Sequence, residues 1–399
     1  MRDTTIVPAV MFHSVGIEDI PWVWSDLSQD VSSFERILKG LAEAGFTTVD
    51  LDELYWHMEG ERKLPPNRIA LTLDDGYLDN WVYVVPLLRR YGMRATIYVT
   101  PEFVNPESVL RPTADEMDAV ALRTTPGHRA GFMSWDELAA AEREGILDVQ
   151  SHALTHTWYF SGPKLVDLHR PGHPNRYPWL SWNARPERKP YYLTEDQQAF
   201  VPWGTPIFEH GKSLVTRRFE PEPERQEEIA RFIAEEGGLE FLATEDWQHA
   251  FTARFGPIEE ITFPGRQETT DEYRDRVLDE LARSREIIGS RLGKTVDFLC
   301  WPGGGVSDEA AELARQAGYR SWTLSSWQQP EFRNRPGANP ETIKRVAGQG
   351  AVYWRNLRVQ DDIPDWTVLR VLMHQGSLKA RISGKLRKAA WAGRSLLTD

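Results

Sequence analysis

The sequence predicts an α/β fold in which a mainly parallel sheet or barrel is covered by helices. Short runs of β-branched or apolar residues alternate with segments whose apolar residues recur every three or four positions. This alternation is typical of consecutive strand-helix units. Reactive side chains also follow several of the predicted strands, at the ends where parallel α/β proteins gather their catalytic groups. We therefore expect a barrel with one catalytic end.

Eight strands are predicted, and some of the helices between them carry signals at their ends. The strands are expected at 7–12, 47–51, 68–73, 95–99, 147–150, 296–300, 321–324 and 368–373. The helices are expected at 34–44, 80–91, 135–144, 273–291 and 308–317. Ser134, followed three residues later by Glu137, predicts a capping box at the start of the third helix.

The stretch 157–261 interrupts this alternation. It is rich in Pro and Arg and has no regular period. Because a structureless loop of this length would be unusual in a compact domain, we expect it to fold over the catalytic face as an insertion within a single barrel of residues 1–376. Its first half concentrates aromatic side chains, namely Trp158, Tyr159, Phe160, Tyr177, Trp179, Trp182, Tyr191, Tyr192, Trp203 and Phe208.

Composition narrows the classes of function. The chain carries 47 Lys and Arg against 59 Asp and Glu, and its net charge of −12 opposes binding to nucleic acid. Cys300 is the single cysteine, so a metal would have to use His and carboxylate ligands. The sequence shows neither a signal-peptide pattern nor an apolar run of about 20 residues, the length of a membrane span, so a cytoplasmic location is expected.

Residues 377–399 form a basic C-terminal tail. One interpretation is an amphipathic helix in peripheral contact with anionic lipid, and the more common alternative is a solvated terminal helix. Basic and apolar residues alternate in the tail, namely Lys379, Arg381, Ile382, Lys385, Leu386, Arg387, Lys388, Trp391 and Arg394.

Two adjacent aspartates follow the predicted strand 68–73. Neighbouring residues of a strand point to opposite faces, so Asp74 and Asp75 can serve one site only if the backbone turns, which Gly76 permits. Two close carboxylates repel each other, and a metal ion on one of them leaves the other available as a base. The alternative interpretation is an ordinary surface turn, in which Asp-Asp-Gly is common.

Two histidines follow the predicted strand 147–150. His152 and His156 are four residues apart, so on one helical turn they would face the same way and could bind a single ion. A structural histidine pair is the alternative. Together with one aspartate, the two imidazoles form a three-ligand set with positions open for water, which is typical of a catalytic metal site.

Further candidate residues follow other predicted strands. His13 comes after the first strand, Gly303 after 296–300 and His374 after 368–373. In a parallel barrel all these strand ends meet at one face.

Taken in order, five motifs resemble those of the polysaccharide deacetylase family with the NodB-homology fold, whose members remove N-acetyl or O-acetyl groups from glycans. The resemblance covers about 7–156 and 262–376 and implies a distorted (β/α) barrel of the NodB type. The motifs are Val10-Met11-Phe12-His13, Leu71-Thr72-Leu73-Asp74-Asp75-Gly76, Ser151-His152 through His156, Trp301-Pro302-Gly303-Gly304 and Leu372-Met373-His374.

The resemblance implies a role for each reactive residue. Asp75, His152 and His156 would bind a divalent metal ion, with zinc expected and cobalt, manganese, nickel or iron as alternatives. Asp74 would be the general base that takes a proton from the attacking water, and His374 the general acid that protonates the departing amine.

Other residues would complete the site. The backbone N–H of Gly303 would help to hold the tetrahedral oxyanion. Substrate contacts are expected from His13, Trp301, Trp158 and Tyr159. The expected substrate is an N-acetylated sugar of a glycan or glycolipid, with an O-acetylated sugar as an alternative.

The sequence departs from the family pattern at the supporting residues. The family often has an arginine, braced against the catalytic aspartate, where this chain has Cys300. Thr323 and Ser326 stand in place of two supporting carboxylates. Two alternative functions follow, an inactive carbohydrate-binding descendant and a metal-free hydrolase of cyclic amides. The intact ligand set argues against both.

Overall fold

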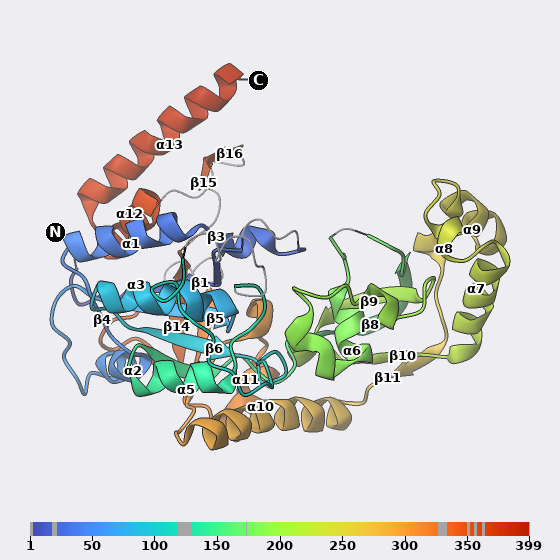
Figure 1. Cartoon of the computed structure of the whole chain (residues 1–399), viewed down its shortest axis with the longest axis horizontal. Coiled ribbons are helices and arrows are strands. Elements are labelled where there is room, and N and C mark those ends of the chain that lie inside the picture. The colour runs from blue at the N-terminus through green and yellow to red at the C-terminus, as the bar shows by residue number, and fades with distance from the viewer. Residues whose placement is uncertain are drawn as a thin grey trace.

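Seven parallel strands close into a barrel in the computed structural model, which describes residues 3–17, 22–118, 129–172, 174–325, 333–348, 352–354, 357–360 and 364–398 (Figure 1). The first strand pairs with both the second and the last barrel strand, and these two pairings close the ring. The barrel strands are β1 (Ala9–Phe12), β5 (Arg68–Asp75), β6 (Ala95–Val99), β7 (Leu147–Ser151), β12 (Phe298–Leu299), β13 (Ser321–Ser325) and β14 (Thr342–Ala347).

Helices cover the outside of the barrel, as the alternating sequence pattern predicts. Figure 1 shows α1, α3 and α12 on one side of the strands and α2, α5, α10 and α11 on the other. The capping box of Ser134 and Glu137 is confirmed at the start of α5. The helices are α1 (Val31–Glu43), α2 (Leu51–Glu59), α3 (Val85–Arg90), which continues a π-helical turn over 80–84, α5 (Trp135–Arg143), α10 (Thr270–Leu292), α11 (Asp308–Gln316) and α12 (Pro364–His374). No helix within the described ranges is both long and apolar enough to cross a bilayer.

Two predicted strands are wrong or too long. Residues 368–373 belong to helix α12, which packs against α1, because a short apolar run does not distinguish a buried strand from a buried helix. The predicted strand 47–51 contains only the two residues of β4 (Thr47–Thr48), since Asp50 caps α2 immediately afterwards. β4 pairs with the first residues of β5, outside the closed ring.

The last barrel strand, β14, was not predicted. Its sequence, Thr-Ile-Lys-Arg-Val-Ala, places two charges in the middle of a β-branched run. Both charged side chains, Lys344 and Arg345, are buried. Buried charges are rare unless they are paired, so this run does not have the apolar pattern that indicates a buried strand.

Between β7 and α10 the chain leaves the barrel and folds into a compact lobe. A long antiparallel pair, β8 and β9, forms its base, and Figure 1 shows α7, α8 and α9 farthest from the barrel. The elements are β8 (Trp158–Leu168), α6 (Pro178–Ala184), β9 (Pro206–Lys212), β10 (Phe219–Pro221), α7 (Pro223–Glu235), α8 (Leu239–Leu242), α9 (Trp247–Phe255) and β11 (Gly265–Gln267). Outside barrel and lobe lie the short pairs β2 (Ser14–Val15) with β3 (Ser28–Gln29) and β15 (Val352–Trp354) with β16 (Leu357–Gln360).

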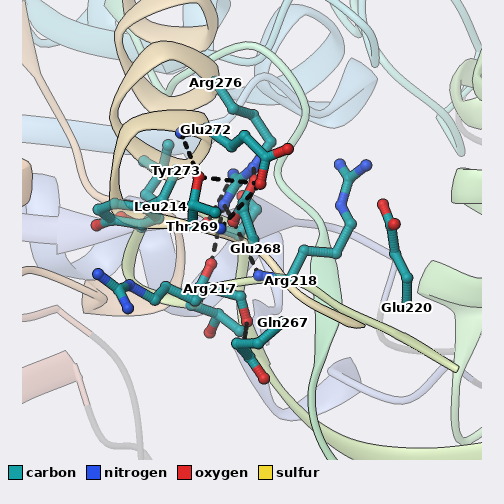
Figure 2. A network of polar contacts seen from close by, with 12 residues as sticks. Leu214, Arg217, Arg218, Glu220, Gln267, Glu268, Thr269, Glu272, Tyr273 and Arg276 are labelled. Carbon is teal, nitrogen blue, oxygen red and sulfur yellow. Dashed lines mark hydrogen bonds and ion pairs between the residues drawn. The ribbon is translucent and has the colours of Figure 1, made fainter. Parts of the chain in front are cut away.

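A largely buried ion pair fastens this lobe to helix α10. Figure 2 shows Arg276 and Glu268 pointing toward each other, with nitrogen–oxygen distances of 2.7 and 2.8 Å. Glu268 also accepts a hydrogen bond from the backbone N–H of Arg218, and Arg276 donates to the carbonyls of Ser213 and Thr216. The barrel helix α10 therefore holds the segment between β9 and β10 in place.

Replacing Arg276 by Ala should destabilise the protein by about 3 kcal/mol, because it leaves the buried Glu268 carboxylate without its partner. The measurement is denaturant unfolding followed by tryptophan fluorescence. Arg266→Ala is the matched control, since Arg266 pairs with Glu220 and Glu272 but is exposed, and its unfolding midpoint should stay near that of the wild type. Equal effects of both substitutions would contradict the role of the buried pair.

Candidate active site

A cavity of about 380 Å³ opens at the carboxyl ends of the barrel strands. The barrel supplies one part of its wall and the lobe supplies the other. The barrel side includes Met11, His13, Asp74, Asp75, Tyr77, His152, His156, Trp301, Gly303, Gly304, Thr323 and Arg345. The lobe side includes Trp158, Trp182, Tyr192 and Lys212, and Trp24, Leu27, Phe103 and Phe132 complete the lining.

The structure brings Asp75, His152 and His156 together in this cavity. The Asp75 Oδ1 atom lies 3.1 Å from His152 Nε2 and 3.3 Å from His156 Nε2. The other ring nitrogen of His152, Nδ1, lies 2.8 Å from the carbonyl oxygen of Cys300. A hydrogen bond from Nδ1 to that carbonyl fixes the ring so that Nε2 faces Asp75, which is how proteins orient metal-binding imidazoles. The donor set therefore fits a divalent metal ion.

The backbone around these three residues is strained. Asp75 (φ 75°), Ala153 (φ 60°) and His156 (φ 43°) all adopt positive φ, and Asn67 is the one other non-glycine residue to do so in the described part of the chain. Such conformations cost about 1–3 kcal/mol each and persist mainly where the surrounding structure requires them, often at functional sites. The expected helical turn between His152 and His156 is wrong, because residues 152–157 form an irregular loop. This loop nevertheless brings the two rings to a centroid distance of 5.0 Å.

The electrostatic surroundings favour an ionised Asp75 and a neutral His156. Burial alone would raise the pKa of Asp75, but the hydrogen bond from His152 and the two neighbouring imidazoles lower it below its usual range. Burial lowers the pKa of His156 to about 4. At neutral pH the ionised Asp75 carboxylate thus faces the neutral imidazole of His156, and both are forms that bind metal. Burial lowers the pKa of His152, but Cys300 and Asp75 raise it overall to well above its usual value, so this ring has to lose a proton when a cation binds.

Asp74 is held by Arg345, which the sequence did not single out. The guanidinium forms a bidentate ion pair with the carboxylate, at 2.6 Å to Oδ1 and 2.8 Å to Oδ2. Cys300 Sγ lies 3.0 Å from the same guanidinium and 3.4 Å from Asp74 Oδ2. All three side chains are buried. A guanidinium from β14 thus contacts the aspartate where the family pattern would place an arginine at position 300.

The ion pair decides the charge of Asp74. Burial would raise the pKa of this carboxyl, and the charge and hydrogen bonds of Arg345 lower it overall. Arg345 was not predicted because its strand, β14, was not predicted. A single arginine inside a β-branched run was the available signal, since a charged residue in a barrel strand needs a buried partner.

His13, which follows β1, lies beside Asp74, and Tyr77, which follows β5, lies beside Asp75. His13 Nε2 lies 3.8 Å from Asp74 Oδ2, and its Nδ1 atom is buried without a hydrogen-bond partner among the described residues. The Tyr77 hydroxyl is hydrogen-bonded to Asp75, and burial together with that carboxylate raises the pKa of Tyr77 well above its usual value. Tyr77 therefore stays protonated and donates to Asp75. Sequence reasoning missed this residue.

The side chain of Lys212, from the lobe, lies against the turn at Gly303. Gly303 has a φ of 56°, a conformation that favours glycine, and a Cβ atom there would lie 2.9 Å from Lys212 Cε and displace that side chain. The Lys212 ammonium donates a hydrogen bond to the Gly303 carbonyl. The amides of Gly304 and Gly305 donate within the turn, which makes the Gly303 amide the candidate donor toward the cavity.

His374 lies away from the cavity, contrary to the expectation. It ends helix α12 on the side of the barrel where β1 begins, since the adjacent Gln375 bonds the backbone of Asp3 and Ile6. Burial and the charge of Arg333 lower its pKa to about 4, so it is neutral at physiological pH. Its position does not support the expected role of general acid, because the terminal motif lies on a helix that runs back from the catalytic end.

The expected substrate contacts divide between the cavity and the lobe. Trp301 and Trp158 line the cavity, and the Trp158 ring stacks on Trp24 with centroids 5.6 Å apart. Tyr159 points elsewhere because neighbours on a strand alternate, and it packs against Arg218 and Arg276. Ser326 lies outside the described residues.

Comparisons with known proteins agree with this geometry. The family model described as polysaccharide deacetylase matches residues 61–200 and 220–322. The chain belongs to the polysaccharide deacetylase family. It is also similar to YxkH of Bacillus subtilis (strain 168), whose name assigns it as a polysaccharide deacetylase, with 30% identity over 93 residues. That match covers 23% of this chain and 31% of the relative, so the chain spans about a third of the relative's length.

The chain is also similar to solved structures of deacetylases. A de-N-acetylase from Aggregatibacter actinomycetemcomitans matches with a TM-score of 0.50 and 15% identity, over 85% of this chain and 94% of the other. The deacetylase domain of BpsB from Bordetella bronchiseptica gives a TM-score of 0.49 and 17% identity, over 87% and 97% of the two chains. The first of these confirms the predicted NodB-type barrel.

Replacing Arg345 by Lys should shift the acid limb of the polysaccharide deacetylase pH profile to higher pH. A lysine cannot form the bidentate pair, and losing one charge-assisted hydrogen bond raises the pKa of Asp74. The measurement is acetate release as a function of pH. Metal content serves as the internal control, because Arg345 touches none of the three clustered metal-binding candidates. A uniform loss of rate with an unmoved acid limb would contradict this role.

Proposed function

We propose that this protein is a metal-dependent deacetylase that removes an acetyl group from an N-acetylated sugar of a glycan or glycolipid. O-acetylated sugars are the alternative substrates. The observation that carries the proposal is the convergence of Asp75, His152 and His156 beside a second, separately held carboxylate, Asp74. Family membership supports the reaction class.

Asp75, His152 and His156 would hold the metal ion. Two imidazole nitrogens and one carboxylate oxygen suit zinc, and cobalt, manganese, nickel and iron are compatible with the same donors. When bound, such an ion activates water and polarises the acyl carbonyl. Tyr77, by donating to Asp75, would fix the orientation of the carboxylate ligand.

Asp74 would accept the proton of the attacking water. A general base must be ionised and correctly oriented, and the bidentate contact with Arg345 supplies both conditions. The Gly303 amide would donate to the oxyanion that forms on the acyl group. Lys212 would support that amide from the lobe.

His13 takes the place of His374 as the proposed proton donor. It is the described imidazole in the cavity that lies outside the metal-binding set, and it stands beside Asp74. An amine is a poor leaving group unless it is protonated, so an imidazolium at this position would complete the reaction.

The aromatic wall supports a carbohydrate substrate. Trp24 and Trp158 stack on each other at the cavity edge, and Trp182 and Tyr192 extend the same surface. Aromatic faces pack well against the apolar faces of sugar rings. A purely binding descendant would have no need for the base, its arginine partner and the cation-binding cluster together.

Two variants should distinguish the loss of metal binding from the loss of catalysis. His152→Ala should lose both the metal ion and activity, since it removes a ligand. Asp74→Asn should retain the metal ion and lose about 10²–10⁴-fold in rate, the usual contribution of a general base. Elemental analysis and acetate release from a panel of N-acetylated and O-acetylated sugars measure the two properties. The proposal would be wrong if both variants remained as active as the wild type.

The two histidines offered as proton donors should also behave differently. His13→Ala should slow amide hydrolysis by about 10²-fold or more, because the departing amine needs a proton. It should affect an aryl acetate ester much less, since a phenolate leaves without one. His374→Ala is the control, and its folded fraction should keep a rate close to the wild type on both substrates. A selective loss of amide hydrolysis in His374→Ala would instead restore the assignment taken from the sequence.

A further inference from the structure

The C-terminal helix α13 (Leu378–Thr398) packs against α12 and lies beside the β15–β16 pair. Figure 1 shows it extending away from the body after α12, with the C-terminus at its outer end. Ala380 is buried, and Gly384 lies against Met373 and Trp366, so close that a Cβ atom there would be 3.0 Å from the Met373 sulfur. Trp391 makes an edge contact with Trp366 at 5.5 Å. These contacts fix which face of the helix points outward.

The outward face carries an apolar stripe. Leu378, Ile382 and Leu386 are 66%, 52% and 67% exposed and follow one another at intervals of four residues, which places them in a row along the helix. The other large hydrophobic side chains that are exposed among the described residues come from separate elements, namely Trp56, Leu110, Val166 and Leu239. Isolated exposed apolar residues are normal, whereas a contiguous row on a rigid element indicates an interaction surface.

Basic side chains flank the stripe. Lys379, Arg381 and Lys385 are exposed, and none of them forms an ion pair with a described residue. Residues 378–398 contain no Asp or Glu, although the whole chain has a net charge of −12. The helix therefore presents a local positive field on an acidic protein, which an oppositely charged surface would complement.

We propose that this outer face of α13 docks on an anionic membrane surface. The three apolar side chains would enter the boundary between headgroups and acyl chains, and the flanking Lys and Arg side chains would lie at the lipid phosphates. The helix would lie on the membrane rather than span it, consistent with the lack of a spanning helix in the described ranges. This inference goes beyond the proposed function and does not depend on catalysis.

Charge favours a lipid surface over a second copy of the chain. A two-fold pairing through the stripe would bring like charges together from both helices, and like charges across an interface oppose association. An acidic lipid headgroup layer instead offers the opposite charge over an extended plane, with an apolar interior immediately beneath it.

Vesicle flotation of the full chain tests the proposal. Wild-type protein should float with vesicles of phosphatidylcholine mixed with phosphatidylglycerol, and much less with phosphatidylcholine alone. Binding should weaken as salt is raised, because surface electrostatics are screened. Neutralising Lys379, Arg381 or Lys385 to Gln should reduce partitioning by about fivefold each. The double variant Ile382→Glu with Leu386→Glu should abolish it.

A matched control and a second measurement complete the experiment. Leu239→Glu changes an exposed apolar residue on α8 and should leave vesicle binding unchanged. Thermal unfolding midpoints verify that each variant is folded. The proposal is overturned if wild-type protein does not bind the anionic vesicles, or if the α13 variants bind them as well as the wild type. Sedimentation showing a dimer that the double variant dissociates, without vesicle binding, would assign the stripe to self-association instead.

Discussion

The bidentate ion pair between Arg345 and Asp74 connects the closure of the barrel to the chemistry at its mouth. β14 pairs with β1, which in turn pairs with β5, and this chain of pairings completes the ring. The same β14 carries the guanidinium that holds the carboxylate at the end of β5. Burying a charged residue inside a barrel costs free energy unless the residue is fully paired. Arg345 and Asp74 form such a pair, so each lowers the cost of burying the other. The strand that closes the barrel therefore also orients the proposed base, Asp74, and keeps it ionised.

The cation-binding cluster beside this pair depends on irregular backbone. Asp75 and His156 reach a common point only because the chain adopts positive φ at these positions and at Ala153. The strands on either side, β5 and β7, are regular and buried, and their pairing through β6 sets the distance between the two loops. A rigid parallel sheet therefore supports a small strained region in which the reactive groups gather.

Much of this arrangement was predictable from the sequence, for physical reasons that differ by element. Six of the seven barrel strands were expected because their apolar runs are buried on both faces, and the helices because their apolar residues recur with helical spacing. The grouping of Asp75 with His152 and His156 followed from their positions after strands. By contrast, the strand β14 was not predicted, because a buried position in its middle holds the paired charge of Arg345 rather than an apolar side chain. His374 was misplaced because a short apolar run fits a helix as well as a strand. Contacts made across the fold, such as those of Tyr77 and Lys212, leave no local pattern.

The contact between Lys212 and the turn at Gly303 has a consequence for how such a protein can diversify. Lys212 belongs to the lobe, and the glycine turn belongs to the barrel. The segment that forms one side of the substrate cavity therefore also restrains a backbone amide proposed to act in the reaction. Exchanging this lobe for that of a relative would remove the restraint along with the old binding surface. On the proposed mechanism, substrate preference and reaction rate are thus coupled traits in this chain, and grafting that altered one would require readjusting the other.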